Sequence, residues 1–123
     1  MTTKTMMRAA ALAAFVALAV GGLALADGAV PKVETGKDIA LDRSKGNCLG
    51  CHEMPGIPDN ILPGNVGPAL AGVKKNYPDK SVLRAHIWNE ASFQPNTSMP
   101  PFGKHHILTE DEINKVTDFV YGL

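Results

Sequence analysis

The sequence has few cysteines and no surplus of either charge, and both features exclude classes of protein. Two cysteines among 123 residues are too few for a disulfide-rich scaffold or for a zinc site with four cysteines. Twelve lysines and arginines balance twelve aspartates and glutamates, so the chain lacks the basic surplus that nucleic-acid-binding proteins usually carry. Hydrophobic residues make up 45% of the chain and charged residues 20%, which indicates a folded protein and not a disordered one. The length allows one small domain.

The long hydrophobic run of the sequence lies at its amino terminus and has the layout of a secretory signal peptide. Lys4 and Arg8 form a basic start, and residues 9–26 are apolar or glycine and end in small residues suited to cleavage. A retained membrane anchor is the alternative, because a run of this length is near the lower limit for a membrane-spanning helix. The run is mostly alanine, however, and a glycine pair at 21–22 weakens its helix, so cleavage after Ala26 is favoured.

These features divide the chain into three parts. We expect residues 1–26 to be a cleaved signal peptide, residues 27–35 a flexible leader and residues 36–123 a single folded domain. The mature protein would then have no membrane span and would work in the periplasm, where thiols meet oxidants. A domain this small usually needs a disulfide, a metal or a cofactor to stabilise it.

Helix signals dominate the predicted domain, and no strand pattern is present. Thr109 and Glu112 form a capping box that predicts a helix from this point to the C terminus. Asp79 is suited to cap a second helix, and residues 36–43 predict a short helix before the cysteines. The apolar faces expected for the later two helices are Val82, Leu83, His86 and Ile87 in one, and Ile113, Val116, Phe119 and Val120 in the other.

Two long segments are too rich in proline, glycine and polar residues to be helical. Residues 53–68 and 89–103 therefore predict loops. Long irregular loops are unusual in a compact domain unless a functional group organises them. The expected fold class is all-α, with short helices and long loops wrapped around such a group.

Both cysteines occur in one motif, Cys48-Leu49-Gly50-Cys51-His52. The Cys-x-x-Cys-His pattern is the attachment motif of c-type haem. On one helical turn its three functional side chains lie on one face, so that two thiols can reach two vinyl groups of one porphyrin while the imidazole reaches the iron. The motif therefore predicts one covalently attached haem c, whose large apolar ring would also supply the core that the short chain lacks.

Three other interpretations of the motif are weaker. A thioredoxin-like redox pair would need a flanking βαβ pattern, which is missing. A zinc site would need a second cysteine pair or well-spaced histidines. The other histidines are His86, His105 and His106, and they are poorly spaced for a zinc finger. A plain disulfide beside a histidine by chance is the third alternative.

The second axial ligand of the iron decides which chemistry the haem can perform. Met99 lies in the proline-flanked segment 95–103, which can hold its thioether rigidly against the iron; its alternative role is to fill a gap in the core. Met54 follows His52 by two residues, which span at most roughly 7 Å, too little to reach the opposite face of the porphyrin. We therefore expect His52 and Met99 to be the axial ligands, which favours electron transfer.

The remaining candidates have ordinary structural interpretations. His86 lies on the apolar face of the helix expected after Asp79, where a core or surface histidine is a better interpretation than a ligand. His105 and His106 precede the last helix and fit a solvated helix entry. Trp88 could donate its indole N–H to a haem propionate or pack as a core aromatic, and the sequence favours neither role.

Beyond this motif, the sequence resembles the class I cytochromes c. The shared features are the cysteine motif, Gly67-Pro68-Ala69-Leu70-Ala71-Gly72, Met99-Pro100 and a C-terminal helix. Within that class it is most similar to SoxX, the monohaem subunit of the SoxAX cytochromes, from about residue 36 to residue 123. The segments that favour SoxX are Gly46-Asn47, Tyr77-Pro78-Asp79 and Met99-Pro100-Pro101-Phe102-Gly103.

The class I resemblance implies that the first and last helices cross near the haem. It also implies that the backbone carbonyl of Pro68 orients the imidazole of His52 through the ring nitrogen that does not bind iron.

The resemblance to SoxX implies a role in thiosulfate oxidation. SoxAX is a periplasmic L-cysteine S-thiosulfotransferase that oxidatively joins thiosulfate to a cysteine of the SoxYZ carrier. The bond-making residues are expected on the SoxA-type partner of a heterodimer, and no catalytic residue is expected on this chain. Its haem would relay electrons to a small soluble cytochrome c. The cysteine count fits this role, because haem attachment would use both thiols.

Two other functions remain open. The chain could be a free-standing periplasmic class I cytochrome c that carries electrons between partners. It could also be a haem enzyme or ligand sensor with an open sixth position, which predicts that Met99 can be replaced without a change in the haem spectrum. We expect no nucleic-acid partner for any of these functions.

Overall fold

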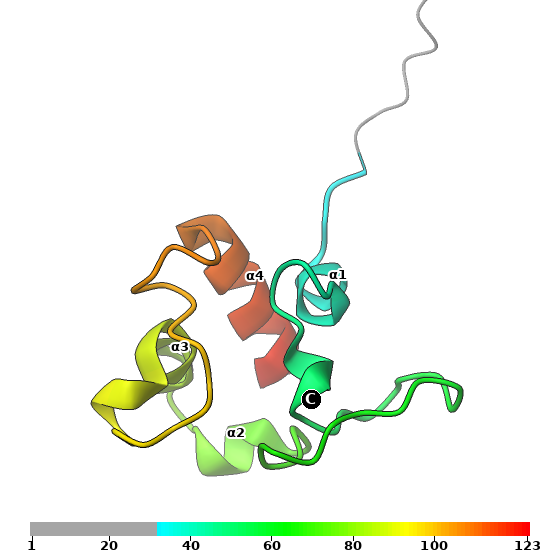
Figure 1. Cartoon of the computed structure of the whole chain (residues 1–123), viewed down its shortest axis with the longest axis horizontal. Coiled ribbons are helices and arrows are strands. Elements are labelled where there is room, and N and C mark those ends of the chain that lie inside the picture. Colours follow the sequence, from blue (N-terminus) through cyan, green and yellow to red (C-terminus); the bar gives the residue numbers. More distant parts are fainter. Residues whose placement is uncertain (1–31) are drawn as a thin grey trace, which may run out of the picture. The chain divides into compact units, whose positions relative to one another are not determined.

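The domain consists of short helices joined by long loops, as the computed structural model of residues 32–123 shows (Figure 1). The predicted signal peptide (1–26) and the first part of the predicted leader (27–31) lie outside the described residues. Residues 32–123 contain no strand, which confirms the all-α fold class. The elements are α1 (Gly36–Leu41), the 3₁₀ turn η1 (Cys48–Gly50), α2 (Val73–Asn76), α3 (Lys80–Asn89), the 3₁₀ turn η2 (Glu90–Ser92) and α4 (Glu110–Tyr121).

The predicted caps of the two longest helices are confirmed. At the start of α4, the Thr109 hydroxyl accepts from the Glu112 N–H while the Glu112 carboxylate accepts from the Thr109 N–H at 2.8 Å. At the start of α3, the Asp79 carboxylate accepts from the Ser81 N–H at 2.8 Å. Helix α2 was not predicted, because four residues are too few to display a helical period.

The last residues of the predicted leader contact the first helix. Thr35 caps α1 through a second capping box, in which the Asp38 carboxylate accepts from the Thr35 N–H at 2.9 Å. Lys32 lies 3.6 Å from the same carboxylate. Helix α1 then ends at Leu41, two residues before the predicted end, because the backbone of Asp42 is extended.

Helices α1 and α4 pack against each other in close contact (Figure 1). Gly36 makes this approach possible, because a Cβ at this position would lie 2.0 Å from the carbonyl oxygen of Lys115 and 2.9 Å from the Cβ of Phe119. Ile39 and Ala40 are fully buried on the same helix. Any side chain larger than hydrogen at position 36 would therefore push the two helices apart.

The hydrophobic core joins α3 and α4 and extends to α1 and to the segment before α4. Leu83 and Ile87 are buried as predicted, whereas Val82 is 43% exposed. Successive helical residues are rotated by about 100°, which turns Val82 away from the face that Leu83 and Ile87 share. The buried core consists of Ile39, Val73, Leu83, Ile87, Phe102, Leu108, Ile113, Val116 and Val120.

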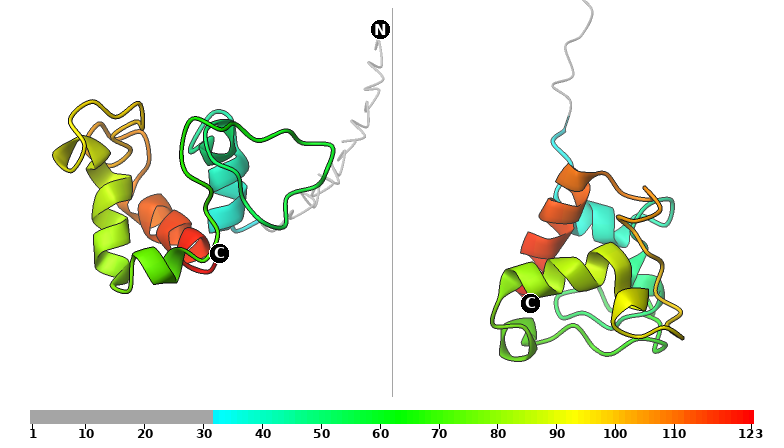
Figure 2. Two further views of the ribbon diagram at one scale, coloured as in Figure 1. Left: turned by 90° about the horizontal axis from the view of Figure 1, so that it is seen from below. Right: turned by 90° about the vertical axis from the view of Figure 1, so that its left-hand side faces the viewer.

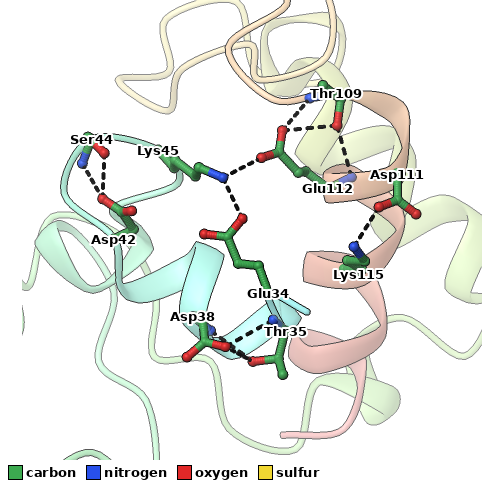
Figure 3. Close-up of polar contacts among 10 residues, drawn as sticks. All are labelled: Glu34, Thr35, Asp38, Asp42, Ser44, Lys45, Thr109, Asp111, Glu112 and Lys115. Atoms are coloured by element: carbon green, nitrogen blue, oxygen red, sulfur yellow. Dashed lines mark hydrogen bonds and ion pairs between the residues drawn. The ribbon is translucent and has the colours of Figure 1, made fainter. Parts of the chain in front are cut away.

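One ammonium group joins three segments of the domain (Figure 3). The Nζ of Lys45 lies 2.7 Å from Oε1 of Glu112 at the start of α4, and it also contacts the carboxylate of Glu34. The Lys45 hydrogen bond is the main cause that lowers the pKa of Glu112 to about 2, and the Thr109 N–H adds to it. Because Lys45 precedes Cys48 by three residues, these ion pairs attach the entry to the cysteine motif to α4.

Candidate haem-binding site

The cysteine motif forms one tight turn, as the sequence predicts. Asn47 opens the turn with a left-handed backbone at φ 46°. The carbonyl oxygen of Cys48 accepts from the N–H of Cys51 at 3.1 Å and from the N–H of His52 at 2.9 Å. These bonds span three and four residues and close a single helical turn, which carries the three functional residues of the motif.

The two cysteines are free thiols, and both are half-buried. Cys48 packs against the hydrophobic core. Burial raises the pKa of Cys48 to about 11, so the group is a neutral thiol at ordinary pH. Within residues 32–123, no three His, Cys, Asp or Glu side chains gather in a way that could hold a metal ion by themselves. The turn thus offers two unpaired thiols beside a histidine.

The imidazole of His52 is held by backbone from the far end of the following loop. Its Nδ1 donates to the carbonyl oxygen of Pro68 at 2.7 Å. Gly67 lies directly against the ring, because a Cβ there would be 2.3–2.8 Å from three ring atoms of His52. A metal-bound histidine typically donates its other ring N–H to such a carbonyl, and this arrangement leaves Nε2 of His52 as the nitrogen with a lone pair for a metal.

The loop 53–68 returns alongside the motif, which is why Pro68 reaches His52. Three backbone hydrogen bonds of 2.8–2.9 Å connect the two segments: Gly64 N–H to Leu49, Gly67 N–H to Cys51 and Leu70 N–H to Glu53. A Cβ at Gly64 would lie 2.0 Å from the carbonyl oxygen of Gly50, so this pairing also depends on glycine. The predicted loop is confirmed, and the pairing that holds its end was not predicted.

Met99 lies in the second long loop, half-buried against the core. Its N–H donates to the Thr97 hydroxyl at 3.1 Å. The loop ends where the N–H groups of Gly103 and Lys104 donate to the carbonyl oxygen of Trp88, at 3.1 and 3.3 Å. Met99 is therefore carried by a loop attached to the end of α3. Met54 is buried, with 5% of its surface exposed, which agrees with a packing role.

The other singled-out residues are His86, Trp88, His105 and His106. His86 has Nδ1 2.6 Å from Oε2 of Glu90 and is mostly buried, so it is the satisfied histidine that the sequence favours. His105 and His106 are exposed in the turn before α4. Trp88 is half-buried, with Gly103 packed against its ring.

Polar contacts of Arg84 beside these residues were not predicted from the sequence. The guanidinium of Arg84 lies over the Trp88 ring at 5.4 Å and donates to Asn114 at 2.7 Å. The local sequence pattern gave no signal for the hydrogen bond between Arg84 and Asn114, because α3 and α4 are separate segments of the chain. The pair of His86 and Glu90 did leave a signal, since residues four apart on a helix are neighbours.

The residues of the turn fit a c-type haem. Two free thiols and one histidine lie on a single turn, and the imidazole is oriented by a backbone carbonyl with its second nitrogen left for iron. Separately, none of the helices within residues 32–123 is long and apolar enough to cross a membrane.

Comparison with known proteins gives matches to c-type cytochromes. Residues 32–120 match the family described as cytochrome c oxidase, cbb3-type, subunit III. The crystal structure of SoxXA from P. pantotrophus superimposes with a TM-score of 0.62 at 25% sequence identity, over 70% of this chain and 77% of that chain.

One curated relative is a longer protein that matches this chain over part of its length. An uncharacterized lipoprotein of Aquifex aeolicus (strain VF5) is 36% identical over 77 residues, which are 63% of this chain and 36% of that protein. The match thus spans about a third of the relative's length. The family match shows that the chain belongs to the family of cytochrome c oxidase cbb3-type subunit III, whose members are electron-transfer cytochromes with covalently bound haem c. Together with the structural similarity to SoxXA, it shows that the domain is a SoxX-like class I cytochrome.

Proposed function

We propose that this chain is the monohaem electron-transfer subunit of a periplasmic SoxAX-type complex. In that complex, thiosulfate is oxidatively conjugated to a cysteine of a SoxYZ-type carrier. The likeness to SoxXA, which covers 77% of the matched chain, supports the assignment. The haem site of this proposal rests on the hydrogen bond of 2.7 Å between His52 and Pro68, which leaves one imidazole nitrogen for iron, whereas the assignment to a SoxAX-type complex rests on the likeness to SoxXA.

In this proposal the cysteine turn and the second long loop supply the haem contacts. Cys48 and Cys51 would form the thioethers to the haem, and Nε2 of His52 and the sulfur of Met99 would bind its iron. The carbonyl of Pro68 keeps the His52 proton on Nδ1 and makes the imidazole a stronger donor. When bound, the haem supplies one-electron redox chemistry, and a methionine ligand closes the sixth position to other ligands.

Met99 is a better candidate for the second ligand than Met54 or His86. Met54 is two residues from His52 and buried in packing. His86 is engaged by Glu90. Met99 combines a half-buried position with a loop that begins and ends at α3, which can support a side chain at a distance from the cysteine turn.

The composition limits what this subunit can do. Joining a carrier thiol to thiosulfate forms a sulfur–sulfur bond and releases two electrons and one proton. The chain has no cysteine besides Cys48 and Cys51, so with both bound to haem it has no thiol for this step. We therefore assign bond formation to a SoxA-type partner, and to this chain the transfer of the electrons, one at a time, to a small soluble cytochrome c.

Co-purification tests the assignment to a complex. Native protein from cells grown on thiosulfate is followed by its haem absorbance through size exclusion. We expect it to elute with a larger cytochrome, and the fraction to reduce cytochrome c only when both thiosulfate and carrier are present. Elution alone, with electron transfer that needs neither, would instead assign the chain as a free-standing electron carrier.

Replacement of Met99 tests the axial ligand. Met99→Ala should open the iron to added ligands, change the visible spectrum and lower the reduction potential. Met54→Leu is the matched control, because it keeps the buried volume and should leave the spectrum unchanged. A Met99→Ala protein with the parent's spectrum and potential would remove Met99 from the site.

A further inference from the structure

A cluster of three rings and a carboxylate lies at the C-terminal end of α3, apart from the cysteine turn. The Nδ1 of His86 is 2.6 Å from Oε2 of Glu90, and the two side chains are only 18% and 12% exposed. The His86 ring stacks on Phe93, with centroids 3.8 Å apart and planes 18° apart. The Tyr77 ring lies edge-on to the His86 ring, with the two centroids 5.1 Å apart.

The side chains of this cluster connect η2 to α3, because His86 of α3 contacts Glu90 of η2 and Phe93 directly after it. No residue of η2 is buried, and no side chain caps it. The ring of Phe93, directly after η2, is 48% exposed and stacks on the His86 ring. Burial and, secondly, the charge of the Glu90 carboxylate raise the pKa of Tyr77.

The segment attached in this way leads directly to Met99. The carbonyl oxygen of Glu90 accepts from the N–H groups of Phe93 and Gln94, both at 2.9 Å. Gln94 in turn accepts from the Thr97 N–H at 3.0 Å, and the Thr97 hydroxyl accepts from the Met99 N–H at 3.1 Å. A continuous series of hydrogen bonds therefore runs from the His86 cluster to the backbone of Met99.

The other end of the same loop returns to the same turn of α3 (Figure 2). Gly103 donates to the Trp88 carbonyl at 3.1 Å, and a Cβ at Gly103 would lie 2.0 Å from the Trp88 ring. The Trp88 attachment is thus made of backbone and close packing. The first attachment depends instead on two side-chain contacts of His86, one with Glu90 and one with Phe93.

We infer that His86, Glu90 and Phe93 are positioning residues that hold the Met99 loop in its ligating conformation. This inference rests on the proposed function, in which Met99 binds the iron. When the stack is removed, the loop samples conformations with Met99 away from the iron, and an added ligand gains access in proportion to that population. The cluster therefore sets how readily the sixth position opens.

The experiment measures imidazole binding to the ferric holoprotein by the change in its visible spectrum. Phe93→Ala removes the stack at a half-exposed position, and we expect roughly tenfold tighter imidazole binding because the open population rises. Phe93→Tyr keeps the ring and should restore the parent's affinity. Val82→Ala is the matched control, because Val82 is 43% exposed on the same helix but lies outside the cluster.

Two results would overturn the inference. If Phe93→Ala lowers the melting temperature but binds imidazole as the parent does, the stack has a structural role only. If Val82→Ala tightens binding as much as Phe93→Ala, the effect is not specific to the cluster.

Met99→Ala, measured beside these variants, separates the proposed axial ligand from the inference about the cluster. If it binds imidazole no more tightly than the parent, Met99 is not the ligand, and the proposed axial ligand and the inference about the cluster both fail. If it binds more tightly and Phe93→Ala does not, only the inference about the cluster fails.

Discussion

The Nδ1 of His52 donates to the carbonyl oxygen of Pro68 across 2.7 Å, although the two residues are 16 positions apart in the chain. A carbonyl can only accept, so the proton stays on Nδ1 and the lone pair on Nε2. This contact depends on the returning loop, whose Gly67 fits against the ring because it has no side chain. The loop of residues 53–68 therefore orients the imidazole of His52, the proposed iron ligand.

Gly67→Ala tests this dependence. The new Cβ would lie 2.3 Å from a ring carbon of His52, so the ring or the loop must move and the hydrogen bond to Pro68 is lost. Without this hydrogen bond the imidazole of His52 is a less basic ligand, and it therefore stabilises ferric iron less. We expect the reduction potential to rise, by about 60 mV for each tenfold loss of preference for ferric iron. Spectroelectrochemical titration measures the potential.

The control for this variant is Gly56→Asn in the same loop. A Cβ at Gly56 would meet nothing within 4 Å, and its φ of 74° suits asparagine better than most residues. The reduction potential of the Gly56→Asn protein should equal that of the parent. An unchanged potential in Gly67→Ala would mean that the contact with Pro68 does not tune the iron.

Gly36→Ala tests the contact between α1 and α4. The added methyl group would lie 2.0 Å from the backbone oxygen of Lys115, and backbone cannot move aside as a flexible side chain can. We expect the free energy of unfolding to fall by about 1–3 kcal/mol, the usual cost of overpacking. Denaturant titration of the holoprotein measures it. Lys37→Ala, at the adjacent exposed position, should remain near the parent, and a Gly36→Ala protein equally close to the parent would contradict the packing argument.

Glu112→Gln tests the ion pair with Lys45 through its pH dependence. The pKa of Glu112 is lowered from 4.5 to about 2, chiefly by the Lys45 hydrogen bond. Its contribution to stability is therefore complete above pH 4.5 and is lost as the pH falls towards 2. Glutamine still fits a capping box, so the variant removes the charge and keeps the cap.

The expected result is a smaller difference between parent and variant at low pH. Above pH 4.5 the Glu112→Gln protein should be the less stable of the two, and the difference should shrink as the pH falls towards 2. Thermal unfolding at a series of pH values measures this. A difference that is constant over this range would show that the charge of Glu112 is not what stabilises the parent.

Replacement of the cysteines tests covalent attachment. Cys48→Ala and Cys51→Ala should each retain haem on the denatured polypeptide through the remaining thioether, and the double variant should release it. Haem-dependent staining of the denatured protein distinguishes these cases. Haem that stays bound to the denatured double variant would exclude both thiols as the sites of attachment.

Features that depend on neighbouring residues were predictable from the sequence. The Thr109 and Glu112 capping box lies within one turn, and the start of α4 is confirmed. The single turn of the cysteine motif is also confirmed, because three and four residues separate its members. Prolines and glycines predicted the two long loops for the same reason, since they act on the local backbone.

Features that depend on distant residues were less predictable. Val82 was expected on the buried face of α3 and is exposed, because the position of α4 selects which part of the apolar face is covered. Nothing in the local pattern marks Gly36 as the contact point with α4, or Lys45 as the partner of both Glu34 and Glu112. Each of these contacts joins segments that the chain brings together only when it folds.

The sequence by itself determined the helix starts, the loops and the chemistry of the cysteine turn, because hydrogen bonds and sterics within a few residues decide them. The resemblance that it displays also pointed to Pro68. Only the tertiary structure decided how close that carbonyl comes to His52, and that His86, Glu90 and Phe93 meet where the Met99 loop begins. The physical reason is that these contacts depend on the return path of each loop, which is set by packing against helices far away in the chain.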